Sequence, residues 1–166
     1  MEKNIKKCTK VILPILATII LMYAIIYIDV VLRAREAYLE GEKYWSWHHN
    51  PQLKEQMLLA EFEKEKNKLE KDKNPNIFSR ILFGKKPLTE EEYNLHLEAL
   101  KFEYERKRKE SAIKYAYVWY QTVVELFSPP ESKYVRLARQ KMPLAKELWK
   151  EELRRKGVPF EEYMLE

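Results

Sequence analysis

The chain has 166 residues, of which 34% are charged and only three are glycine, and its formal net charge at pH 7 is +5. Its single cysteine excludes an internal disulfide and any zinc finger or iron–sulfur cluster that needs several cysteine ligands. Lysine and glutamate supply most of the charge and favour helices, while alternating β-branched runs are absent from the sequence. The composition therefore predicts an all-α protein.

One apolar segment dominates the N-terminal part of the chain. Residues 11–28 include no charged side chain, and residues 30–32 extend the apolar stretch beyond Asp29. A helix needs roughly 20 mostly apolar residues to cross the hydrocarbon core of a bilayer. The segment predicts a transmembrane anchor over residues 11–32, preceded by a basic tail over residues 1–10.

Two other interpretations of this segment stay open. A cleaved signal peptide has a shorter apolar region of about 7–15 residues that ends in a small-x-small motif. Ala34 and Ala37 have the wrong spacing for that motif, so an uncleaved signal anchor is favoured. A buried helix in a soluble core seldom stays apolar on every face, which makes the third interpretation weaker.

The distribution of basic residues around the anchor predicts its orientation. Glutamates dilute the basic residues that follow the anchor, whereas four lysines precede it, at Lys3, Lys6, Lys7 and Lys10. The positive-inside bias favours a cytoplasmic N-terminus and places the rest of the chain on the opposite, extracytoplasmic side. In a bacterium this side is the periplasm.

The first helix is predicted to continue past the membrane to about His48. Residues 29–48 contain no proline, and their apolar stripe at helical spacing comprises Val31, Ala34, Tyr38 and Trp45. Together with the anchor, such a helix is roughly 60 Å long. Asn50 is suited to cap the next helix and Pro51 to occupy its first position, so a break is expected there.

A second helix is predicted over residues 51–73. Beyond Phe62 this helix is almost entirely charged, which is typical of a helix that projects into water. The connection that follows, through Pro87, carries five large apolar residues: Ile77, Phe78, Ile81, Leu82 and Phe83. We expect this connection to pack on the domain's own core, on the membrane surface or on a partner.

Thr89 and Glu92 have the spacing of a capping box and predict the start of a third helix. We expect this helix to run uninterrupted to about Phe127. Its last part, residues 112–127, is apolar or aromatic on nearly all sides but too short for a comfortable membrane span. That part indicates a helix buried between neighbours or an interaction face.

A last, amphipathic helix is predicted over residues 131–156. Gly157 is expected to end it, and the acidic tail over residues 158–166 is expected to be extended. The chain as a whole is expected to carry one elongated extramembrane helical domain, residues 33–157. About three further long helices are predicted in this domain after the anchor helix.

Three histidines are the candidates for a metal site. His48 and His49 are adjacent on a helix, so their side chains point about 100° apart, and a third ligand would have to come from His96. We therefore expect no metal and no cofactor. Packing or partner contact is the favoured role of the neighbouring Trp45 and Trp47.

A basic cluster offers a second candidate surface, formed by Arg106, Lys107, Arg108 and Lys109. Such a cluster can bind the phosphates of lipid headgroups or of nucleic acid. Beyond the anchor, however, acidic and basic residues nearly balance, so a nucleic-acid partner is not expected. A solvated helix face or contact with an acidic partner is favoured.

The sequence contains no motif of a catalytic nucleophile, a phosphate-binding loop or a zinc hydrolase, so neither enzymatic activity nor a small-molecule substrate is expected. It predicts a single-pass accessory or scaffolding subunit of a larger membrane complex. Aromatic side chains dominate binding energy, and those expected at the partner interface are Trp45, Trp47, Tyr115, Trp119, Tyr120 and Trp149. The alternatives are a stand-alone membrane-tethered adaptor that captures a soluble partner and a histidine-based metal or redox protein.

Overall fold

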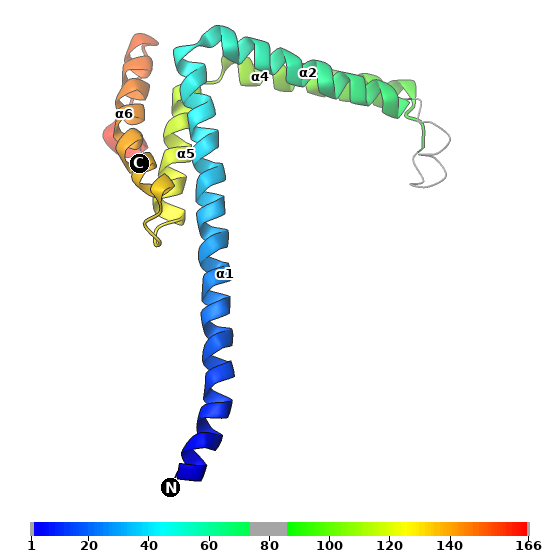
Figure 1. Ribbon diagram of the computed structural model, residues 1–166. Coiled ribbons are helices and arrows are strands. Elements are labelled where there is room, and N and C mark those ends of the chain that lie inside the picture. Colours follow the sequence, from blue (N-terminus) through cyan, green and yellow to red (C-terminus); the bar gives the residue numbers. More distant parts are fainter. Residues whose placement is uncertain (1, 74–85, 166) are drawn as a thin grey trace. The chain divides into compact units, whose positions relative to one another are not determined.

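The structure is a computed structural model that describes residues 2–73 and 86–165, with side chains from Leu13 onward (Figure 1). Within these residues it has five α-helices, one short 3-10 helix and no strand, which confirms the all-α fold. The elements are α1 (Glu2–His49), α2 (Pro51–Lys73), α4 (Glu90–Lys109), α5 (Ala112–Leu126), α6 (Lys133–Arg155) and the 3-10 helix η1 (Glu162–Leu165). The chain divides into two compact units: unit 1 comprises residues 1–45 and 113–166, and unit 2 comprises residues 46–112.

α1 is one helix from the N-terminal tail to His49, as predicted for its continuation beyond Asp29. Every residue from Leu13 to Asp29 is exposed. The helix is long and apolar enough to cross a membrane, with a mean hydropathy of 2.5 over its most apolar window and none of that window buried within the chain. By length and composition this segment fits a membrane anchor or a signal sequence.

Burial along α1 begins where the apolar run ends. Val30 and Val31 are half-buried, and Ala34, Ala37 and Tyr38 are buried in the core of unit 1. This confirms the predicted stripe along the second half of the helix. In Figure 1, α5 and α6 lie beside only this later part of α1. The second half of α1 is therefore not an isolated helix but one of three helices, with α5 and α6, around a shared core.

Gly41 lets α1 and α5 approach closely. A Cβ atom at this position would lie 2.7 Å from Cε1 and 2.9 Å from Cδ1 of Tyr120, and 3.4 Å from Cβ of Trp119. The first two distances are shorter than packed carbon atoms make. A glycine inside a helix usually weakens it. Here its missing side chain makes room for the buried Tyr120 ring.

α5 and α6 complete the core of unit 1. The fully buried side chains are Ile113, Ala116, Tyr120 and Val123 of α5 and Val135, Ala138 and Ala145 of α6. The Oγ of Ser132 caps α6 and accepts a hydrogen bond from the Val135 N–H at 3.3 Å. The predicted amphipathic character of this last helix is confirmed, because Tyr134, Leu137, Met142, Leu148 and Trp149 pack on this core.

Both helices of unit 2 begin at the predicted caps. The Asn50 Oδ1 accepts a hydrogen bond from the Leu53 N–H at 3.2 Å, one residue before α2 begins. At the start of α4, Thr89 and Glu92 form a complete capping box. These local signals act through the backbone N–H groups that the first turn of a helix leaves unpaired.

The prediction that the charged half of α2 projects into water is wrong in part: none of residues 63–73 is buried, but this half lies along α4, with Lys73 Nζ 2.7 Å from Glu90 Oε2. α2 and α4 run side by side, and the Phe62 and Tyr104 rings are 5.4 Å apart between centroids. Charges on α2 find partners of opposite sign on α4, including Lys107 Nζ, which lies 2.8 Å from Glu61 Oε1. The charged side chains of α2 thus help to hold α2 and α4 together as a helical hairpin.

The prediction of an uninterrupted third helix is also wrong. α4 ends at Lys109, Glu110 has an extended backbone with φ −65° and ψ 144°, and α5 starts at Ala112. Lys54 Nζ donates to the carbonyl oxygens of Arg108 at 3.0 Å and Glu110 at 2.7 Å. The ammonium group therefore satisfies carbonyls at the end of α4, where a helix leaves them unpaired. Within the described residues, the break gives four α-helices after α1 instead of three.

The C-terminal tail is not extended over its last residues. Gly157 adopts a positive φ of 66° after α6, and η1 then brings Leu165 into a buried position with 3% exposure. The Tyr117 hydroxyl donates to the Leu165 carbonyl oxygen at 2.9 Å. The tail carries this apolar residue back to α5, a contact that no local pattern predicts.

The predicted apolar connection, with Ile77, Phe78, Ile81, Leu82 and Phe83, lies outside the described residues, and its packing stays a prediction. The division of the chain into a basic tail, an anchor, one extramembrane domain and an acidic tail likewise stays a prediction.

Candidate functional site

Three helices of unit 1 converge on one carboxylate, that of Glu42 on α1. The Tyr120 hydroxyl of α5 donates to Glu42 Oε1 at 2.6 Å. Lys141 Nζ of α6 lies 2.6 Å from each of the two Glu42 oxygens. Tyr38, one turn earlier on α1, also donates to this carboxylate. We call these four residues the Glu42 network.

The Glu42 network favours an ionised carboxylate beside neutral phenols. Burial by itself would raise the pKa of Glu42, but the hydrogen bonds from Lys141 and the two tyrosines outweigh it and lower this pKa. Burial, assisted by the Glu42 charge, raises the pKa of Tyr38 to about 12 and also raises the pKa of Tyr120. At neutral pH the network is therefore an ion pair flanked by two hydroxyl donors.

The geometry of the network is that of a joint between helices. The Glu42 and Lys141 side chains are only 30% and 29% exposed, and both carboxylate oxygens already accept hydrogen bonds. Lys141 Nζ also lies 5.4 Å from the Trp45 ring centroid, within the range of a cation–π interaction. Such a satisfied network fixes three helices at one point.

Sequence reasoning missed the Glu42 network. Glu42 and Lys141 are separated by 99 residues and belong to no recognisable motif. One local signal was present, because Gly41 interrupts an otherwise strong helical pattern, and an isolated glycine there often marks close packing. It indicates a contact but does not identify the contacting helix.

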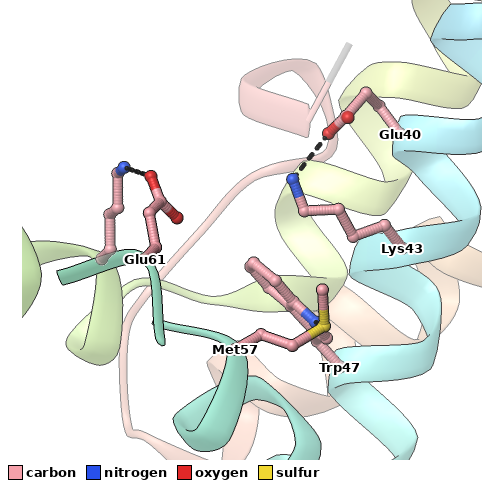
Figure 2. A network of polar contacts seen from close by, with 6 residues as sticks. Glu40, Lys43, Trp47, Met57 and Glu61 are labelled. Atoms are coloured by element: carbon pink, nitrogen blue, oxygen red, sulfur yellow. Dashed lines mark hydrogen bonds and ion pairs between the residues drawn. The ribbon is translucent and has the colours of Figure 1, made fainter. Parts of the chain in front are cut away.

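The tryptophans near the end of α1 are used for packing inside the chain. Trp47 is 5% exposed, and Figure 2 shows its indole beside the sulfur of Met57, to which the indole N–H donates at 3.3 Å. Trp45 packs on the core of unit 1, with its ring centroid 6.3 Å from that of Tyr120. Burial therefore accounts for Trp47 without a partner protein.

The three histidines are not assembled into a metal site. His48 and His49 lie edge to face, with ring centroids 5.2 Å apart, and His96 is exposed on α4. Across residues 2–73 and 86–165, no group of three or more His, Cys, Asp or Glu side chains is arranged to hold a metal ion.

The remaining aromatic candidates lie in unit 1. Tyr120 is fully buried, and Tyr115 stacks on Tyr44 with ring centroids 5.2 Å apart. Trp119 and Trp149 are half-buried against the core. Tyr120 thus belongs to the interior, whereas the half-buried rings keep an accessible edge and their role in partner binding stays a prediction.

Three of the four basic candidates on α4 pair with carboxylates inside unit 2. The pairs are Arg106–Glu110 at 2.5 Å, Lys107–Glu61 at 2.8 Å and Arg108–Glu55 at 3.1 Å. Lys109 is exposed at the end of the helix. The pairs compensate most of the positive charge of the cluster, which favours a role in helix packing over phosphate binding.

Sequence reasoning also missed an exposed apolar stripe on α4. Leu95 and Phe102 are 67% and 72% exposed, and the exposed Ala99 lies between them. We call these three residues the α4 stripe. The other side of α4 faces α2, where Leu100 and Tyr104 help to line a cavity of about 280 Å³. The i, i+4, i+7 spacing of the stripe was a signal that could have revealed it.

Comparisons with family models, with curated proteins and with solved structures found no match to this chain. Two exposed apolar surfaces of the described residues therefore carry the functional inference: the first half of α1 and the α4 stripe.

Proposed function

We propose that the chain is a single-pass, membrane-anchored scaffolding subunit of a larger membrane complex, acting through helix-mediated protein contacts and not through catalysis. The observation that carries this proposal is the dual use of α1. Its first half exposes a strongly apolar window, none of which is buried, and its second half supplies Ala34, Ala37 and Tyr38 to the core of unit 1. An anchor that continues into a core helix fixes the folded unit at a defined level above the membrane.

An uncleaved anchor is favoured over a signal peptide. Cleavage after the apolar run would leave the new end of α1 next to Ala34, where terminal residues of a helix fray. The spacing of small residues also lacks a cleavage motif. The basic tail favours a cytoplasmic N-terminus, so the chain beyond the anchor lies on the extracytoplasmic side.

The α4 stripe is the surface that we assign to a partner protein. Apolar side chains at i, i+4 and i+7 are the anchors by which one helix docks on another or in a groove. The small Ala99 at the centre allows a partner helix to approach between the two larger side chains. Burial of Leu95 and Phe102 would each contribute about 1.5–3 kcal/mol before the costs of association.

The anchor is tested on the chain purified from native membranes. We expect the protein to resist extraction by alkaline carbonate and its intact mass to include residues 11–32. A chain that is released by carbonate, or one shortened near residue 33, would contradict the anchor.

The scaffolding role is tested by size-exclusion chromatography of the solubilised native membranes. We expect the chain to elute with another membrane protein at a fixed stoichiometry. The double variant Leu95→Glu with Phe102→Glu should release that protein, because it places two charges in the apolar contact. Leu144→Glu is the matched control, since Leu144 on α6 is 56% exposed and outside the α4 stripe. A monodisperse wild-type monomer would contradict the subunit role.

A further inference from the structure

We propose that unit 1 makes a second contact with the bilayer that α1 crosses, through the turn between α5 and α6. We call residues 126–130 the α5–α6 corner. This inference rests on the proposed membrane anchor and adds a lipid-facing surface outside α1.

The packing of α5 on α1 fixes the direction of α5. Tyr115, near the start of α5, stacks on Tyr44 with ring centroids 5.2 Å apart. Further along α5, Tyr120 meets Gly41 and lies 5.9 Å from Tyr38 between ring centroids. Residue numbers therefore rise along α5 as they fall along α1. The two helices are antiparallel, and α5 runs toward the apolar half of α1.

The same register fixes the level of the corner. Leu126 ends α5 six residues after Tyr120, which is roughly 9 Å farther toward the N-terminal half of α1 and about level with Ala34. The apolar run of α1 ends nearby at Leu32. The headgroup region on each side of a bilayer is about 5–8 Å thick, so the corner falls within it. Figure 1 shows the corner at the end of the α5–α6 pair that points toward the N-terminus of α1.

The corner presents apolar groups at this level. Leu126 is 72% exposed and Pro129 is exposed, while Phe127 is half-buried and packs on the core of unit 1. The anchored Phe127 ring holds the corner in place, and Leu126 is left pointing out of the fold. Moving an apolar side chain in this position from water into the membrane interface lowers the free energy.

The charged groups near the corner suit a lipid headgroup layer. Lys133 is exposed, and a long cationic side chain can reach lipid phosphates while its stem stays in apolar surroundings. Three acidic groups near this level have partners within unit 1: Asp29 with Arg33 at 2.8 Å, Glu131 with Arg139 at 2.7 Å, and Glu125 with the Gln121 amide at 2.8 Å. Glu36 on α1 is exposed to the headgroup layer. A zwitterionic bilayer is therefore sufficient for the contact.

The test places single nitroxide labels on the full-length chain. Cys8→Ser removes the native cysteine, and Leu126→Cys, Leu144→Cys and Ile20→Cys each introduce one labelling site. All three introduced positions are exposed side chains, so none of the labels displaces a packed residue. In phosphatidylcholine nanodiscs, electron paramagnetic resonance compares collisions with oxygen, which concentrates in lipid, and with an aqueous nickel complex.

We expect oxygen collisions to dominate at Ile20, nickel collisions to dominate at Leu144, a site on α6 farther from the corner, and the ratio at Leu126 to lie between these two. A ratio at Leu126 as nickel-dominated as that at Leu144, together with oxygen-dominated collisions at Ile20, would overturn the corner contact and leave the anchor intact. Nickel-dominated collisions at Ile20 would refute the anchor itself, and the corner contact with it.

Discussion

Unit 1 and unit 2 hold their helices together by different means. Unit 1 buries large side chains completely, among them Tyr120, Ile113 and Val123 at 0% exposure. In the described part of unit 2 the buried apolar residues are Trp47, Leu58 and Ala112. Its two helices are joined by exposed or half-exposed ion pairs, which are Glu61–Lys107, Glu55–Arg108 and Lys73–Glu90.

The difference predicts unequal stability. Buried apolar area contributes about 25 cal/mol per Å², whereas an exposed ion pair contributes at most about 1 kcal/mol and weakens in salt. We therefore expect unit 2 to open at a lower free energy than unit 1. This difference fits the proposed scaffolding role, in which unit 1 continues from the anchor and the α4 stripe of unit 2 is assigned to a partner.

The largest expected effect is that of Tyr120→Ala. It removes a fully buried ring and a donor to Glu42, so we expect a loss of about 3–5 kcal/mol in the stability of unit 1. Hydrogen–deuterium exchange in detergent should show faster exchange across α5 and α6 and unchanged exchange in α4. Val118→Ala, at a 40% exposed position on the same helix, is the control and should have little effect. Equal acceleration in α4 would show that the two units unfold together.

Acid should weaken unit 1 through Glu42. The pKa of this carboxyl is lowered in the folded chain, so its stabilising contribution is present above the unfolded value of about 4.5 and is lost as pH falls through the folded pKa. Glu42→Gln should cost about 1–3 kcal/mol at neutral pH, because charged hydrogen bonds are lost beside a half-buried Lys141.

The measurement is the exchange rate of α5 amides at neutral pH and at pH 4 in both proteins. The variant should lose much of the acid sensitivity of the wild type. Unchanged acid sensitivity in Glu42→Gln would exclude Glu42 as the source of that sensitivity.

At alkaline pH, Tyr38 should weaken unit 1. The pKa of Tyr38 is raised to about 12 in the folded chain, so the stability of unit 1 falls as pH rises from the unfolded value of 10.

Gly41→Ala should have a smaller effect on unit 1. The added methyl would press on the Tyr120 ring at a cost of about 1–3 kcal/mol, partly offset by a gain of roughly 0.5–1 kcal/mol in helix propensity. Thermal unfolding followed by circular dichroism should show a modest decrease in stability. Combining the variant with Tyr120→Leu should remove the penalty. A more stable single variant would mean that α5 shifts freely to accommodate the methyl.

The smallest effect is expected in unit 2. Lys107→Gln removes the ion pair with Glu61 and should cost less than about 1 kcal/mol, because both side chains are partly exposed. Raising the salt concentration to about 1 M should accelerate amide exchange in α4 more than in α5, since it screens exposed pairs most. A larger salt effect in unit 1 would reverse the comparison between the units.

Features that depend on neighbours within a few turns of one helix were predictable from the sequence. Periodicity and capping chemistry predicted the unbroken α1, the caps at Asn50 and Thr89, the buried stripe of α1 and the amphipathic α6. These features follow from backbone groups and side chains that meet within one helix, so a single sequence contains the necessary information.

Contacts between distant segments of the chain are visible only in the folded structure. Lys54 meets the end of α4, Lys141 reaches Glu42 across 99 residues, and Tyr117 holds Leu165 in place. The first contact lies where α4 ends, the second joins α6 to α1, and the third holds the C-terminal tail against α5. Local propensities differ by tenths of a kcal/mol per residue, and one buried contact or ion pair between helices can outweigh them.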